Sequence, residues 1–313
     1  MTETTTTNPT HGILLKIASV AVFMAMATCV KVVSIHVPTG EVVFFRSFFA
    51  IPVILVWLWF SHDLRHGLKT QNPMGHLWRG LVGGTAMALS FTALGLLPLP
   101  EVTAIGYASP LLVTIFAAMF LGETVRLYRL GAVVLGLAGV LIVLAPRLSV
   151  LGVESATKLE TVGAMAMLMA AVFMALAVVF VRKMVNTETT AAIVFYFSLT
   201  CTVLSLATIP FGWEMPTAKE AALLVAAGLL GGFGQILLTT SYRHAETAVI
   251  APFDYTSMLL ALAIGYTLFA EVPTGSMLAG AVLVVSAGLF IIWREHRLGL
   301  ERGKARKVMT PQG

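Results

Sequence analysis

The sequence predicts an all-α polytopic membrane protein with ten transmembrane helices, arranged as two inverted five-helix repeats. Of its 313 residues, 58% are hydrophobic and only 11% are charged, and the mean hydropathy is +0.91. Soluble domains are about a quarter charged, and even a large soluble domain leaves about a quarter of its surface in water. A water-soluble fold would therefore expose too much apolar surface.

The apolar residues form continuous runs, without the period-two alternation of barrel strands. A helix needs about 20 apolar residues to cross the hydrocarbon core, and only helices and closed barrels can span it. We therefore expect ten transmembrane helices, in the order 13–35, 40–60, 77–97, 101–121, 127–145, 161–181, 190–210, 218–240, 247–269 and 275–293.

The charges around these runs indicate how the chain sits in a bacterial cytoplasmic (inner) membrane. No basic residue precedes the first run, as a cleaved signal peptide would require, so we expect this helix in the mature protein. Most of the 20 Lys and Arg residues fall on the side that carries both termini, which predicts cytoplasmic termini. Residues 1–12 would be a disordered cytoplasmic tail, 146–160 a periplasmic linker and 294–313 a basic cytoplasmic tail.

The two halves of the chain, 13–145 and 161–293, are related. At an offset of 148 residues, GLVGG from Gly80 aligns with GLLGG from Gly228. The same offset aligns the pairs Tyr107 and Tyr255, Ser109 and Ser257, and Glu123 and Glu271. Because each repeat has an odd number of helices, the second enters the membrane from the other side and is inverted. Inverted repeats are typical of secondary transporters with a substrate site at the midplane.

The end of each repeat resembles a known family. PLLVTIFAAMFLGETVRLYRLGAVVLGLAGVLIV and YTSMLLALAIGYTLFAEVPTGSMLAGAVLVVSAGLFII each place a Glu after the fourth helix and a Gly/Ala-rich fifth helix behind it. This is similar to the EamA module of the drug/metabolite transporter superfamily, duplicated to ten helices. The resemblance implies a metabolite carrier, most similar to exporters of aromatic and other neutral amino acids. S-adenosylmethionine-type carriers and general drug or metabolite exporters are the alternatives within the family.

Arg46 is a permanent cation inside the apolar run EVVFFRSFFAIPVILVW. A charge within the membrane costs several kcal/mol and usually faces protein or a wet cavity. Arg46 therefore either binds a substrate carboxylate through its forked donors or reaches the outer interface along its apolar stem. The second repeat has no matching Arg, so an anion site here would be asymmetric.

Two other cations and one acid fall within the expected spans. Lys16 and Lys31 lie near opposite ends of the first helix, and we expect both to reach the headgroups. Asp254 lies about two turns inside the ninth helix, beside Pro252. It is a candidate for proton coupling or for binding a substrate amino group; the alternative is a cap on a helix broken at the proline.

Further candidate substrate contacts are uncharged. Tyr107 and Tyr255 occupy matched positions and offer ring faces and hydroxyls, although plain packing would also explain them. Gln235 is an amide at membrane depth that either links helices or lines a cavity. Ser90, Thr239 and Tyr242 are weaker candidates of the same kind.

The remaining features favour structural roles and exclude other classes. The glycine clusters are expected to let helices approach closely, Glu123 and Glu271 to tie neighbouring helices, and Cys29 and Cys201 to pack as free thiols. No metal-ligand spacing, nucleotide fingerprint or nucleophile–base arrangement occurs, so we expect no enzyme, metal or cofactor. The expected partners are a small-molecule substrate and the lipid bilayer, not nucleic acid, and a monomer is compatible with the sequence. A channel and a non-transporting membrane protein are the rival classes.

Overall fold

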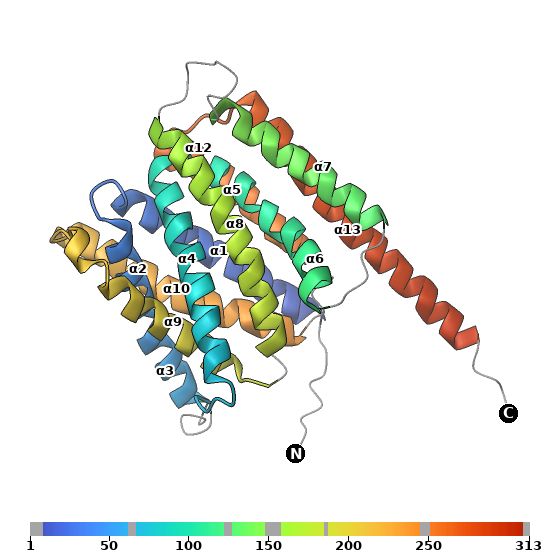
Figure 1. Ribbon diagram of the computed structural model, residues 1–313, viewed down its shortest axis with the longest axis horizontal. Helices are drawn as coiled ribbons and strands as arrows, with labels where there is room; N and C mark the ends of the chain where they lie inside the picture. Colours follow the sequence, from blue (N-terminus) through green and yellow to red (C-terminus); the bar gives the residue numbers. More distant parts are fainter. Residues whose placement is uncertain are drawn as a thin grey trace.

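The computed structural model describes residues 9–61, 67–121, 127–147, 158–184, 187–244 and 251–308, and all regular structure within these ranges is helical (Figure 1). The helices of the first half are α1 (Pro9–Val33), α2 (Thr39–Phe48), α3 (Ala50–Phe60), α4 (Pro73–Leu96), α5 (Leu99–Gly106), α6 (Ala108–Leu121), α7 (Leu127–Leu144) and the short η1 (Ala145–Arg147). Those of the second half are α8 (Lys158–Met184), α9 (Thr190–Leu206), η3 (Ile209–Phe211), α10 (Ala218–His244), η4 (Ala251–Tyr255), α12 (Thr256–Phe269) and α13 (Gly275–Val308).

Two expected helices are interrupted, and prolines explain both breaks. The 40–60 segment divides at Phe49 into α2 and α3, and the 101–121 segment divides at Tyr107 into α5 and α6. Pro52 and Pro110 each lie four residues after the last residue of the preceding helix, where they have no N–H to donate and their rings crowd that carbonyl. The prediction of continuous helices was wrong at these two points.

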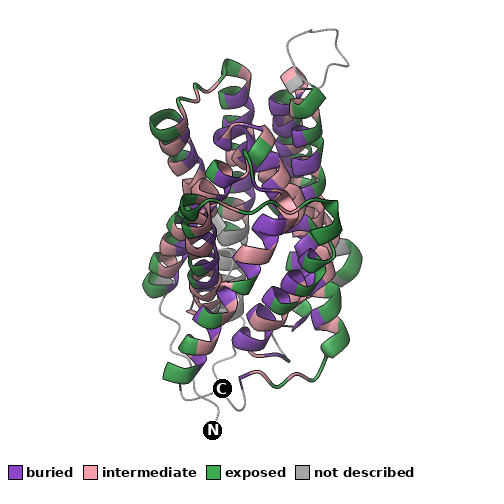
Figure 2. Cartoon of the chain, turned by 90° about the vertical axis from the view of Figure 1, so that its left-hand side faces the viewer, coloured by how far each residue is buried: buried purple, intermediate pink, exposed green. Residues whose placement is uncertain are grey.

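The ends of the chain also differ from expectation. α1 begins at Pro9, so residues 9–12 are helical and do not belong to a disordered tail. α13 continues to Val308, so most of the basic tail extends the last helix. α1 begins and α13 ends at the same end of the bundle, called the terminal end below (Figures 1 and 2).

The composition of the helices suits a membrane. Six described helical stretches are long and apolar enough to cross one, namely Thr10–Val33, Thr39–Phe60, Leu99–Phe116, Lys158–Val181, Ala218–Ser241 and Gly275–Arg294. Shorter apolar helices cover Leu130–Leu144, Thr190–Leu206 and Phe253–Phe269. Buried segments lie toward the inside of the bundle and exposed ones toward its outside (Figure 2). Large apolar side chains such as Val56, Trp59 and Leu141 are among the exposed ones. This outer surface is adapted to lipid contact.

Three extensive antiparallel pairs join the halves of the chain: α1 with α10, α4 with α8, and α7 with α13. Along α1 and α10, His11 meets His244 at one end and His36 meets Glu220 at the other. The α4–α8 pair is fixed in the same way by Gly163 against Leu97 and, beyond the end of α8, by His76 against Glu188. Figure 1 shows α7 and α13 side by side along one flank.

The α7–α13 pair crosses at glycine. A Cβ on Gly139 would lie 2.8 Å from the carbonyl oxygen of Gly280, and a Cβ on Gly280 would lie 2.5 Å from the carbonyl oxygen of Gly139. Backbone atoms cannot move aside as a flexible side chain can. The two helices are therefore in contact only because both positions lack a side chain, as in other close membrane helix pairs.

We predict that Gly139→Ala and Gly280→Ala each destabilise the protein by about 1–3 kcal/mol, because each forces extra volume into a packed crossing. Gly131→Ala is the matched control, since Gly131 is on the same helix and has no neighbour within 4 Å of an added Cβ. Thermal unfolding in detergent measures the difference. Equal unfolding temperatures for Gly139→Ala and Gly131→Ala would show that the crossing is not the tight contact described.

Candidate functional site

Arg46 lies inside the bundle, at the contact between the two halves of the chain. Its residue is 2% exposed. Its guanidinium carbon is 5.7 Å from the ring centre of Phe197 on α9, and its Nε would be 2.9 Å from a Cβ on Gly231 of α10. Of the two interpretations given above, the one in which Arg46 reaches the outer interface is therefore wrong.

A second arginine, Arg79 on α4, shares the same aromatic ring. Its guanidinium carbon is 4.2 Å from the centre of the Phe197 ring. The sequence analysis missed Arg79, because it counted the residue among the basic residues that set orientation. The usable signal was its depth: α4 begins at Pro73, which places Arg79 nearly two turns inside the helix.

Most of the polar groups in this cluster have no partner. The Nε and Nη1 atoms of both arginines are buried without a hydrogen bond. Within the described ranges neither arginine forms an ion pair. We call these three residues, Arg46, Arg79 and Phe197, the arginine cluster. It offers donors and lacks acceptors.

The glycines around the cluster make the space that it occupies. A Cβ on Gly83 would collide with the Arg79 guanidinium and lie 2.9 Å from the Phe197 ring. Gly84 faces the buried thiol of Cys201. Cys29 and Cys201 are both free. The packing role expected for the glycines is confirmed, and at Gly83 and Gly231 it extends to the arginine side chains.

Three other predicted residues, Tyr107, Asp254 and Tyr255, come together near the break between α5 and α6 and the end of η4. Tyr107 separates α5 from α6, Tyr255 is the last residue of η4, directly before α12, and their ring centres are 5.0 Å apart. The Tyr107 hydroxyl is 2.7 Å from the hydroxyl of Ser257. This satisfies it locally, as the packing interpretation requires. No contact joins this group to the arginine cluster among the described residues.

Asp254 forms an ion pair rather than standing alone. Its Oδ1 atom is 2.6 Å from Nζ of Lys16, whose side chain is 3% exposed, whereas the Asp254 side chain is 40% exposed. Lys31, near the other end of α1, pairs with Glu271 at 2.9 Å and donates to the carbonyl of Leu97. The expectation that both lysines reach the headgroups was wrong, because each has a partner inside the protein.

Glu271 ties helices together, as expected. Besides Lys31 it accepts a hydrogen bond from the backbone N–H of Leu99, at the start of α5. The repeat partner Glu123 lies outside the described residues.

The weaker candidates gain little from the structure. The hydroxyl of Thr239 donates to the carbonyl of Gln235 within α10, so it is used by its own helix. Gln235 and Ser90 are half-buried. The side chain of Tyr242 lies outside the described part of the structure.

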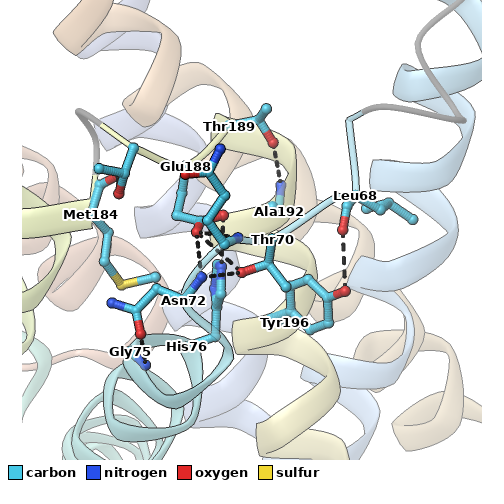
Figure 3. Close-up of polar contacts among 12 residues, drawn as sticks. Leu68, Thr70, Asn72, Gly75, His76, Met184, Glu188, Thr189, Ala192 and Tyr196 are labelled. Atoms are coloured by element: carbon cyan, nitrogen blue, oxygen red, sulfur yellow. Dashed lines mark hydrogen bonds and ion pairs between the residues drawn. The ribbon is translucent and has the colours of Figure 1, made fainter.

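A further polar network, which the sequence analysis did not identify, closes the terminal end (Figure 3). Oε1 of Glu188 accepts hydrogen bonds from the Thr70 hydroxyl and from the backbone N–H groups of Gln71 and Asn72. Its other oxygen is 3.2 Å from Nε2 of the buried His76. Burial acts to raise the pKa of Glu188, but these donors outweigh it and hold the pKa below its ordinary value.

A similar contact lies at the opposite end. Glu41 is buried, and its Oε2 accepts a hydrogen bond from the backbone N–H of Glu214. Nearby, His36 is 3.2 Å from Oε1 of Glu220. At each end, therefore, a carboxylate from one half of the chain holds a loop of the other half.

No group of three His, Cys, Asp or Glu residues suited to a metal ion occurs in the described ranges. The site is thus built from cations, hydroxyls and aromatic rings. Such a site can bind and orient an anion.

Comparison with known proteins identifies the family. The model of the EamA-like transporter family matches residues 10–145 and again 161–293. The pseudopaline exporter CntI of Pseudomonas aeruginosa is 31% identical over 280 residues, covering 88% of this chain and 94% of that protein. The S-adenosylmethionine uptake transporter of Rickettsia bellii is 29% identical, covering 82% and 84%. The riboflavin transporter of Vibrio cholerae is 28% identical, covering 95% and 98%.

A solved structure, titled only as the crystal structure of a protein, has the same fold. It superposes with a TM-score of 0.65 at 20% sequence identity, over 92% of this chain and 99% of that one. The family match spans nearly the whole chain and the relatives are transporters. The chain therefore belongs to the EamA-like transporter family and is a membrane transporter, not an enzyme.

Proposed function

We propose that this protein is a secondary transporter that moves a small carboxylate-bearing metabolite across the bacterial cytoplasmic membrane by alternating access. Amino acids, aromatic and other neutral ones included, are the cargo that the sequence favours, and export is the proposed direction. Both termini would be cytoplasmic, which makes the terminal end the inner face.

Arg46 is the observation that carries this proposal. A buried, unpaired guanidinium in a membrane protein costs several kcal/mol. The cation lies between the first half of the chain, on α2, and the second half, on α9 and α10. In an inverted-repeat carrier this interface is where substrate is held. A carboxylate bound by the forked donors of Arg46 would remove the cost of burying it.

The helix pairing supports ten spans in two inverted units, 13–145 and 161–293. The repeat equates α1 with α8, α4 with α10 and α7 with α13. Exchanging the units therefore converts the α1–α10 pair into α8–α4 and leaves α7–α13 unchanged, and these are the three extensive pairs observed.

The glycine contacts follow the same exchange. The GLVGG glycines of α4 face α9, and the GLLGG glycines of α10 face α2 and α3. Since α9 is the repeat counterpart of α2 and α3, both clusters make equivalent contacts. Matched halves of this kind are able to exchange conformations, which alternating access requires.

The ties at the two ends fit such a cycle. Glu188 and Asp254 join the units near the inner face, and Glu41 and Glu271 join them near the outer face. Opening one face must break the ties there while those at the other face persist. Asp254 would bind a substrate amino group only after Lys16 has been released.

The cargo is less constrained than the mechanism. The relatives are named for pseudopaline, S-adenosylmethionine and riboflavin, and they include an exporter and an uptake transporter. An S-adenosylmethionine-type or general metabolite carrier is therefore the alternative to an amino-acid exporter. A channel is the remaining rival and differs in its kinetics.

Counterflow in proteoliposomes tests the function. Vesicles loaded with an unlabelled amino acid are diluted into the same labelled amino acid, beginning with aromatic ones and extending to other carboxylate-bearing metabolites. We predict transient accumulation of label, reduced at least about tenfold in Arg46→Gln because a charge-assisted bidentate contact is lost. Arg297→Gln, which removes an exposed arginine over Trp293, should behave as the wild type.

Three results would contradict parts of the proposal. Equilibration without an overshoot would indicate a channel. An overshoot that Arg46→Gln leaves intact would place the carboxylate elsewhere. No overshoot with any amino acid would exclude the amino-acid cargo.

The Glu188 network predicts a pH-dependent stability. The pKa of Glu188 in the folded protein lies below its unfolded value of about 4.3. The stabilisation that the Glu188 charge contributes to the folded state is therefore fully present above about pH 4.3 and is lost as the pH falls through the folded pKa. We expect the free energy of unfolding of the wild type to exceed that of Glu188→Gln by about 1–3 kcal/mol near neutrality. In acid, the two free energies should be equal. Thermal unfolding in detergent from pH 7 to about pH 3 measures the gap.

Glu214→Gln is the control, since that carboxylate is exposed and its described hydrogen bond is made by the backbone N–H. A gap between wild type and Glu188→Gln that is constant over the whole pH range would show that the charge of Glu188 does not hold the terminal loops.

A further inference from the structure

The arginine cluster contains two cations, and one carboxylate does not account for both. Arg46 and Arg79 approach the same Phe197 ring at 5.7 and 4.2 Å. Each leaves its Nε and Nη1 atoms buried and unbonded.

Charge makes this arrangement costly without a ligand. Removing one partner from a buried ion pair is strongly destabilising, because an uncompensated charge remains, and here two like charges also repel. Contact with an aromatic face returns only a part of that cost. The ring therefore positions the two guanidinium groups but does not neutralise them.

The described neighbours supply no neutralising group. Glu271 is bound to Lys31 and Leu99, Asp254 to Lys16, and Glu188 to the loop before α4. Glu41 is on the helix of Arg46, but its carboxylate faces the backbone of Glu214. Each of these four carboxylates contacts groups outside the cluster.

We propose that Arg46 and Arg79 form a two-cation subsite that selects a small substrate with two carboxylates, one for each guanidinium. This rests on the proposed function and narrows its cargo. An amino acid with a neutral side chain would satisfy one arginine and leave the other unpaired. A dicarboxylate satisfies both, and the planar forks of arginine match carboxylate geometry.

The two arginines belong to different helices of the first unit, α2 and α4, and the ring between them belongs to the second unit, on α9. A dicarboxylate bound to both would neutralise the two cations beside the opposing unit. Substrate charge would thus favour the closed contact between the units, and a monocarboxylate would leave one uncompensated cation there.

Matched acid and amide pairs test the subsite. Aspartate with asparagine, glutamate with glutamine, and succinate with succinamate differ in one carboxylate and little in shape. Each compound is tested as a competitor of counterflow in proteoliposomes and, separately, for raising the unfolding temperature of the purified full chain in detergent. Phosphoserine and inorganic phosphate are tested separately, to determine whether the two arginines bind one doubly charged phosphate rather than two carboxylates.

We expect at least one dicarboxylate to bind roughly 10- to 100-fold more tightly than its amide, since a charge-assisted hydrogen bond contributes about 1.5–3 kcal/mol. Arg79→Gln should abolish this preference while the amide still binds. Arg79→Lys, which keeps the charge but loses the fork, should retain only part of it. Arg297→Gln should keep the wild-type preference.

Several outcomes would overturn the subsite. These are equal binding of acid and amide in every pair, a preference that survives Arg79→Gln, no binding of any dicarboxylate, or stronger binding of the phosphate compounds. The two proposals fail differently. If dicarboxylates raise the unfolding temperature but nothing drives counterflow, the transport mechanism is wrong and the subsite stands. If amides drive counterflow as well as acids do, transport stands and the subsite is wrong.

Discussion

Two guanidinium groups without a described ion pair, Arg46 buried and Arg79 half-buried, lie against one phenylalanine ring, and the proposed function depends on this constraint. Arg46 and Arg79 would be tolerated easily at a surface, but inside a membrane bundle each needs a counter-charge. The described carboxylates nearby are engaged elsewhere. The contact between the two halves of the protein therefore carries positive charge that no described carboxylate compensates.

The rest of the fold creates and protects this place. Glycines on α4 and α10 remove the side chains that would otherwise fill the space around Phe197 and Arg46. α1 contributes Lys16 toward one end and Lys31 toward the other, and each is paired with an acid of the second half. Ties at both ends, with unsatisfied donors between them, are the arrangement expected of a carrier that opens to one side at a time.

Much of this could be read from the sequence, because helix formation in a membrane depends mainly on local apolar runs. The breaks at Phe49 and Tyr107 were also encoded, by Pro52 and Pro110, but were not predicted. Arg46 was identified as a candidate, but its position in the sequence allowed it either to bind a substrate carboxylate or to reach the outer interface. Its burial is decided by neighbours from α9 and α10, which the local sequence does not reveal. The ion pairs of Lys16 and Lys31 join residues more than 200 positions apart, so no local pattern revealed them. Arg79 was missed because it lies near the start of a helix, where basic residues usually indicate the orientation of the chain in the membrane.

The most direct test is a structure of the chain, determined by electron cryo-microscopy, with the metabolite that gives the strongest counterflow. The account predicts an anionic group of that metabolite within hydrogen-bonding distance of the Arg46 guanidinium, with Arg79 also engaged and the Phe197 ring between the units. Substrate density elsewhere, with both arginines still unpaired or neutralised by a carboxylate of the protein itself, would contradict it.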